Sequence, residues 1–201
     1  PNVYDVAVSG DSTIIASGLE GDAEVQFAAW FGKYFFVDGN DLWTGTQGAA
    51  SKVTYLDADG LPLEGETPKG KSILLHNQRL WLTYNQDRRT YVYFSETDFY
   101  DRWKPLSWVA CDRDDGKKIT GFIEDSDKII SFKRSQMYFI LGDISLGNLS
   151  VYQGPSLGAY DQKTIIRCPD GFVRFYGPAG VWQYSDTTGV MNISQGRVDS
   201  V

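Results

Sequence analysis

Two short segments of the chain combine aspartates with a glycine, as calcium-binding loops do. They are Asp57-Ala-Asp-Gly60 and Asp112-Arg-Asp-Asp-Gly116. An EF-hand loop also needs glycine at its sixth position and a bidentate glutamate at its twelfth. Counted from Asp57, both positions are prolines, and counted from Asp112 they are a lysine and an isoleucine. Both segments therefore predict aspartate–glycine turns, with a calcium loop of another type still open.

Glycoside hydrolysis is the second chemistry to consider, because it usually requires two carboxylates on either side of one bond. No spacing singles out a pair among the glutamates, which are Glu20, Glu24, Glu64, Glu66, Glu96 and Glu124. The segment from Ser95 to Trp103 is similar to the Asp-box turn of sialidases, but it lacks that motif's glycine and occurs once. That box is a structural turn, so we expect a turn here. Glycoside hydrolysis stays the residual possibility for an enzyme.

A single histidine and two cysteines limit the remaining catalytic and metal chemistry. His76 follows the apolar run 73–75, which favours a satisfied residue at a strand end over a ligand or base. Cys111 and Cys168 belong to no C-x-x-C pair, and zinc needs about four close ligands. Free buried thiols are favoured over one disulfide between them. With no G-x-S-x-G elbow and no nucleotide-binding loop, we expect no metal, no cofactor and no catalytic residue.

The charge balance argues against two classes of partner. The formal net charge is -7, whereas proteins that bind duplexes gain affinity from cationic side chains on phosphates. The basic pairs 88–89 and 117–118 are short and flanked by acids, which is typical of solvated turns. No stretch approaches the roughly 20 apolar residues of a membrane span. We therefore expect neither sequence-specific nucleic acid nor a membrane as a partner.

Four segments of the chain look alike, and the fold that they form must position any functional residues. Each has a polar start, an apolar strand, a turn and a second strand with an aromatic residue. They lie at 31–43, 76–95, 127–138 and 170–182, and their second-strand aromatics are Trp43, Tyr93, Tyr138 and Trp182. These aromatics lie 50, 45 and 44 residues apart, a period typical of propeller blades.

The repeat predicts an all-β fold, a β-propeller or propeller segment with about four hairpin-rich blades. We expect one domain over 1–201, with repeats near 24–60, 70–110, 117–155 and 162–196. An aromatic share of 14% suits such a core. A β-sandwich with irregular hairpins is the alternative, and the regular spacing favours the propeller.

Smaller elements complete this interpretation. Residues 53–56 and 149–152 alternate well enough to be outer strands, and 96–103 suit one helical turn. Residues 1–9 and 191–201 are candidates to pair and close a four-bladed ring, which would remove exposed edges. A larger ring completed by residues outside this chain is equally open.

From about residue 70 the order of short motifs carries a family resemblance. The motifs are 75–81, 92–95, Trp103, 119–122, 129–133, 137–142, 158–159, 180–181 and 192–194. In this order they resemble the β-propeller proteins of tailed bacteriophage virions, which lie at the neck or tail of the particle. The resemblance covers roughly 120 residues, and the first 70 lie outside it.

The resemblance implies a structural role and not an enzymatic one. The protein would be located in the virion, contact other virion proteins, and form a homo-oligomeric ring through blade faces or loops. The alternative from the residues alone is a carbohydrate-binding or sialidase-like propeller, in which exposed aromatic rings stack on sugars and carboxylates or amides bond the hydroxyls.

Overall fold

The computed structural model describes most of the chain. The described residues are 2–6, 12–19, 25–64, 67–84, 88–113 and 115–194. They form eighteen β-strands and one short 3-10 helix, so the all-β class is confirmed. None of these residues belongs to a helix long and apolar enough to cross a membrane.

The strands form one two-stranded sheet and four four-stranded sheets. The small sheet pairs β1 (Asn2–Val6) with β2 (Ser12–Ser17). The first large sheet contains β3 (Gln26–Trp30), β4 (Lys33–Val37), β5 (Leu42–Thr46) and β6 (Ala49–Lys52). The second contains β7 (Gly70–His76), β8 (Arg79–Tyr84), β9 (Tyr91–Phe94) and β10 (Trp108–Ala110).

The third sheet contains β11 (Ile119–Asp125), β12 (Lys128–Lys133), β13 (Met137–Leu141) and β14 (Ser150–Gln153). Helix η1 (Gln162–Thr164) precedes the fourth sheet, which contains β15 (Ile165–Arg167), β16 (Val173–Gly177), β17 (Gly180–Ser185) and β18 (Gly189–Asn192). The chain divides into two compact units, residues 1–88 with 92–108 and residues 89–91 with 109–201. The single domain over 1–201 stays a prediction.

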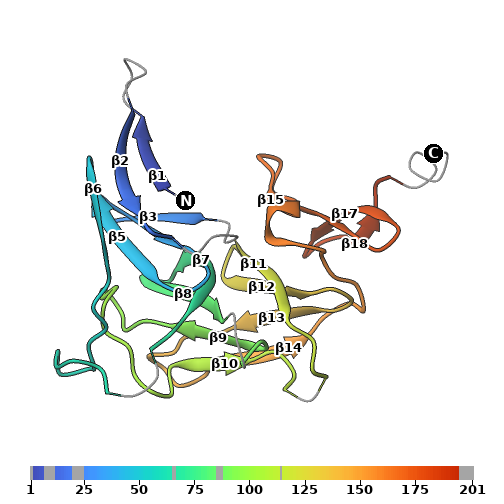
Figure 1. The fold of residues 1–201 in the computed structure, drawn as a ribbon. Helices are drawn as coiled ribbons and strands as arrows, with labels where there is room; N and C mark the ends of the chain where they lie inside the picture. The colour runs from blue at the N-terminus through green and yellow to red at the C-terminus, as the bar shows by residue number, and fades with distance from the viewer. Residues whose placement is uncertain are drawn as a thin grey trace. The chain divides into compact units, whose positions relative to one another are not determined.

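Each large sheet is a meander in which consecutive strands lie side by side (Figure 1). The sheets span 26–52, 70–110, 119–153 and 165–192, each within one predicted repeat. The predicted aromatics all lie on the third strand of their sheet, Trp43 on β5, Tyr93 on β9, Tyr138 on β13 and Trp182 on β17. Their equivalence by strand is confirmed, and closure of the sheets into a propeller stays a prediction.

Some smaller predictions are wrong. The outer strand of the first sheet is β6 and not 53–56, because Leu56 bonds to a loop, accepting from Trp103 N–H at 2.8 Å and donating to Asp101 O at 2.7 Å. Residues 96–103 form turns and no helical turn. The predicted strand at 149–152 is confirmed as β14. At the chain ends, β1 pairs with β2, and residues 1, 7–9 and 195–201 of the predicted closure lie outside the described residues.

The first sheet uses its two faces differently. Because side chains alternate along a strand, Tyr34, Phe36 and Trp43 share one face, where Phe36 stacks on Trp43 at 5.6 Å between ring centroids. Ala16 and Leu19, at the end of β2 and just beyond it, cover this face in one apolar cluster. The sheet is therefore anchored on one side by the small N-terminal hairpin.

One buried aspartate holds the turn between β4 and β5. Asp38 is buried, and its Oδ1 accepts hydrogen bonds from the backbone N–H groups of Asn40 and Asp41 at 3.0 and 2.7 Å. Its other oxygen accepts from Trp43 Nε1 at 3.1 Å. One aspartate thus holds both the turn and the aromatic residue of the repeat, as aspartate does in turns.

Candidate functional sites

Aspartates of the two aspartate–glycine segments accept hydrogen bonds that hold the local structure. Asp57 Oδ1 accepts from the backbone N–H groups of Asp59 and Leu61, both at 2.9 Å, which makes the segment a turn. Asp115 Oδ1 accepts from Lys117 N–H at 3.0 Å and from Lys133 Nζ at 2.6 Å. Asp114 lies outside the described residues. Across the described residues, no three His, Cys, Asp or Glu side chains group as metal ligands.

The other sequence candidates also have structural surroundings. His76 ends β7, is buried, and its carbonyl accepts from Trp81 Nε1 at 3.1 Å, so the strand-end prediction is confirmed. Both cysteines are free thiols, Cys111 buried and Cys168 half-buried. Burial raises the pKa of the Cys111 thiol to about 11, which disfavours a reactive thiolate.

The Asp-box-like segment folds as a tight turn that locks β8 to β9. Ser95 is buried, its Oγ accepts from Leu80 N–H at 3.0 Å, and its carbonyl accepts from Arg79 Nη1 at 2.6 Å. Asp98 has a positive φ of 64° and its N–H donates to Gln78 O at 2.9 Å. Of the six glutamates, Glu20, Glu24 and Glu66 lie outside the described residues, and Glu96 pairs with Lys104 at 3.0 Å.

A sheet face with several exposed apolar side chains is the first candidate for function. On the fourth sheet, Val173, Phe175 and Tyr184 are buried against Ile130 and Phe132 of the third sheet. The register of β15 to β18 places other apolar side chains on the opposite face, with Arg174 and Gln183 between them. There Ile166, Tyr176 and Met191 are 58%, 45% and 51% exposed. We call this surface, with Ile193 beside it, the exposed face of the fourth sheet.

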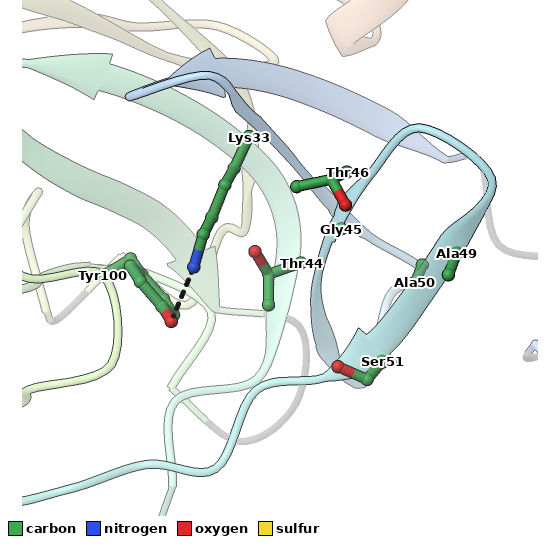
Figure 2. Close-up of a pocket in the computed structure, with 8 residues that line it drawn as sticks. All are labelled: Lys33, Thr44, Gly45, Thr46, Ala49, Ala50, Ser51 and Tyr100. Atoms are coloured by element: carbon green, nitrogen blue, oxygen red, sulfur yellow. Dashed lines mark hydrogen bonds between the residues drawn. The ribbon is translucent and has the colours of Figure 1, made fainter.

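A shallow cavity on the first sheet, open to solvent and lined by both polar and apolar residues, is the second candidate (Figure 2). It has a volume of about 350 Å³. The register places Lys33, Thr44, Thr46 and Ser51 on the face opposite Phe36 and Trp43. Figure 2 shows Lys33 and Tyr100 at one end of the cavity, strand β6 at the other, and Thr44 between them.

The cavity begins where the apolar core of the same face ends. Phe35 and Leu42 are buried on that face, and the Tyr100 ring packs on Phe35 with centroids 5.1 Å apart. Tyr100 OH accepts a hydrogen bond from Lys33 Nζ at 3.1 Å, and the same ammonium lies 4.6 Å from the Tyr100 ring centroid. The loop after β9 therefore places a phenol over strand β4.

The hydroxyl of Thr44 has no hydrogen-bond partner in the part of the chain that the structure describes. Its Oγ1 is buried, and within the described residues no atom is in hydrogen-bonding range. A buried hydroxyl without a partner is unfavourable for folding. Such groups in native structures call for an explanation, and this one lines a cavity.

Sequence reasoning missed this cavity. The alternation of Leu42-Trp43-Thr44-Gly45-Thr46 carries a local signal, since its polar residues fall on one face of a strand. Lys33 and Tyr100, however, are 67 residues apart, and only the fold brings them together.

Comparisons with known proteins show the fold alone. No family model matches the chain, and no curated protein matches it. Two solved structures are similar to it, extracellular domains from B. thetaiotaomicron assigned to a one-component and to a hybrid two-component system. Their TM-scores are 0.53 and 0.56 at 10% and 11% identity, with 90% of this chain covered. The chain spans 23% of the length of each.

Proposed function

We propose that this chain is a structural part of a tailed bacteriophage neck or tail, built from propeller blades, and that it works through protein–protein contacts. The motif order from residue 75 to 194 supports the phage assignment. The exposed face of the fourth sheet supports the mode of action and is the observation that carries the proposal.

The argument for contacts rests on the two faces of the fourth sheet. One face buries Phe175 against Phe132 of the preceding sheet, with ring centroids 4.9 Å apart. The other carries Ile166, Tyr176 and Met191 at about half exposure. Arg174 and Gln183 lie between Ile166 and Met191 in the register. Apolar surface of this kind gains free energy when another surface covers it, roughly 25 cal/mol per Å². In a propeller the next blade covers it, and we assign that role to a second copy of this chain in a ring.

Catalysis has less support than assembly. Paired glycosidic carboxylates must face one bond, and the carboxylates described above hold turns or ion pairs. Among these, Asp57 holds a turn, Asp115 binds Lys133 and Glu96 binds Lys104. These carboxylates therefore support a structural role better than a catalytic one.

Oligomeric state tests the assembly part of the proposal. Size-exclusion chromatography with light scattering should find a concentration-dependent oligomer of the purified chain. The double variant Ile166→Thr, Met191→Thr should raise the dissociation constant at least tenfold. Leu146→Thr is the matched control, since Leu146 is 74% exposed in the turn after β13. A monomer at all concentrations, or equal effects of both variants, would contradict this use of the face.

The phage part needs a separate test. Quantitative mass spectrometry of purified particles should find the chain in a fixed ratio to the other neck or tail proteins. Its absence from particles, or glycoside turnover that disappears when one carboxylate is changed to its amide, would overturn the structural role.

A further inference from the structure

We propose that the cavity on the first sheet binds a small carboxylate-bearing sugar, and that the sugar's carboxylate replaces the Tyr100 hydroxyl as the partner of Lys33. The proposal concerns the cavity alone and does not depend on a role in a virion. It rests on the charge of the lining, the present partner of Lys33 and the unpartnered hydroxyl of Thr44.

The lining has the composition of an anion site. Lys33 supplies one ammonium group, and none of the lining residues that the structure describes is a carboxylate. The chain as a whole has 26 acidic and 19 basic residues, so a lining with a cation and no acid differs from the rest. A single ammonium without a competing carboxylate favours a ligand with one negative charge.

The present partner of Lys33 is uncharged, so an anion can compete with it. A neutral phenol accepts the hydrogen bond at 3.1 Å, and the ring adds a cation–π contact at 4.6 Å. The present bond is already strengthened by the charge of the ammonium, but a carboxylate would add the attraction between opposite charges, which a neutral phenol cannot supply. A carboxylate that enters the cavity would therefore replace the Tyr100 hydroxyl as the partner of the Lys33 ammonium. The Tyr100 ring would stay packed on Phe35.

The unpartnered Thr44 hydroxyl points to a ligand with oxygen atoms. Thr44 lies on the same face as Lys33 and Thr46, two residues from Thr46 on β5. Its Oγ1 is buried and unbonded while Lys33 rests on Tyr100. A small shift of the lining that brings this hydroxyl into reach of a ligand oxygen would give it a hydrogen-bond partner, which relieves the cost of its burial.

The other lining residues are hydroxyl side chains beside Gly45, Ala49 and Ala50, a mixture that favours a sugar ring over a bare ion. Thr46 and Ser51 are exposed hydroxyl side chains along the same strip. A volume of about 350 Å³ falls at the lower end of small-molecule sites, which span roughly 300 to 1,000 Å³. One ring with several hydroxyls and one carboxylate matches this size and this set of donors. Inorganic phosphate would use the cation and leave most of the hydroxyls unpaired.

Titrations followed by two-dimensional NMR of the ¹⁵N-labelled chain test the proposal. The probes are glucuronate, its neutral counterpart glucose, and inorganic phosphate. Glucuronate should bind at least tenfold more tightly than either, with shift changes at Lys33, Thr44 and Tyr100. Equal binding of glucose, or tighter binding of phosphate, would overturn the assignment to an acidic sugar.

Four variants separate the contacts. Lys33→Gln should weaken glucuronate at least tenfold and leave glucose unchanged, while Lys118→Gln, at an exposed site outside the lining, should change neither. Tyr100→Phe keeps the ring on Phe35 and removes the competing hydroxyl, so it should tighten glucuronate binding two- to threefold. Thr44→Val should weaken it about threefold and raise the melting temperature of the free protein. An unchanged Lys33→Gln variant, or weaker binding by Tyr100→Phe, would refute the exchange of partners.

Discussion

The side chain of Gln162 makes two hydrogen bonds to the backbone of Phe122, forty residues away. Its Oε1 accepts from Phe122 N–H at 2.7 Å and its Nε2 donates to Phe122 O at 2.9 Å. The amide thus takes the place of a neighbouring strand beside β11. Gly121 permits this approach, because a Cβ there would lie 2.6 Å from Gln162 Oε1. A side chain of helix η1 therefore joins the third sheet to the start of the fourth.

The first prediction concerns this amide. Gln162→Glu should lower the free energy of unfolding by about 2 kcal/mol at pH 7, because a carboxylate cannot donate to the Phe122 carbonyl. Part of the loss should return near pH 4, where the acid regains a proton to donate. Urea unfolding at both pH values measures it. Gln153→Glu, at an exposed position of β14, is the control. Equal losses in the two variants would refute the bridging role.

The second prediction concerns the buried ammonium of Lys133, which has no exposed side-chain surface. Its Nζ lies 2.6 Å from Asp115 Oδ1 and donates to Asp112 O at 2.9 Å. Asp115 is partly exposed, but its removal leaves a buried ammonium without a carboxylate, so Asp115→Asn should lower the free energy of unfolding by about 2 kcal/mol. Asp170→Asn is the control, because its pair with Arg174 lies at the surface and should change little.

The same pair gives a pH dependence at the acid end. Burial opposes ionisation of Asp115, but the hydrogen bonds from Lys133 and from Lys117 N–H lower its pKa below 3.8. A lowered folded-state pKa means that this stabilisation is present above the ordinary carboxyl pKa and is lost as the pH falls below it. The Asp115→Asn variant should therefore lose less stability than the wild type between pH 5 and pH 3 in urea titrations.

The third prediction concerns alkaline pH and the ion pairs of Lys128. Its Nζ lies 2.6 Å from Asp186 and 3.4 Å from Asp125. Burial opposes the charge, but these carboxylates raise the pKa of Lys128 above 10.5. Burial and the hydrogen bond to Asp186 also raise the pKa of Tyr184.

The pKa values of Lys128 and Tyr184 are both raised in the folded state, so both groups change the stability in the same direction as the pH rises. Their stabilisation is complete below pH 10 and is lost as the pH rises through the folded-state pKa values. Thermal unfolding from pH 9 to pH 12 should show a declining melting temperature. Lys128→Met should make that decline shallower, and Lys118→Met, at an exposed site, should leave it unchanged. A parallel decline in Lys128→Met would contradict the assignment.

Parts of the fold follow from the sequence and parts do not. The hairpins around Trp43 and Trp182 were predictable, because apolar strands and turn residues lie next to each other in the chain. Strand β6 was missed, because Ala49-Ala-Ser-Lys52 has little intrinsic strand preference and pairs only through β5. Segment 53–56 has strand-like residues, yet its Leu56 backbone groups bond to a distant loop. Tertiary pairing overrides local preference in both places.

The candidate sites show the same limit. The sequence does not show that Ile166 and Met191 lie on an exposed face. Residues on the buried face of the same sheet, such as Phe175, are equally apolar. The cavity needs Tyr100 beside Lys33, a contact that depends on how a loop of the second sheet returns to the first. Local patterns specify which strand face is polar, and the packing of sheets decides which face stays open.

The fourth prediction tests a close backbone approach within one of the motifs that carry the phage resemblance. Gly158 lies against the end of β12, where a Cβ would come 1.7 Å from Lys133 O, and the neighbouring Ala159 N–H donates to that same oxygen at 3.2 Å. Because Lys133 is the last residue of β12, its backbone carbonyl is fixed by the strand and cannot move aside as a side chain can. Gly158→Ala should therefore lower the free energy of unfolding by about 3 kcal/mol.

Two other glycines provide graded controls for this prediction. At Gly154 the obstacle is the Phe139 ring, 2.6 Å from an added Cβ, and a ring edge can shift, so Gly154→Ala should cost about 1 kcal/mol. Gly147 has open space and a positive φ of 67°, a conformation that asparagine tolerates, so Gly147→Asn should have little effect. Urea unfolding ranks the three variants. Because the order depends on backbone resisting more than a side chain, a Gly158→Ala variant as stable as Gly154→Ala would show that the segment 158–159 can retreat from β12.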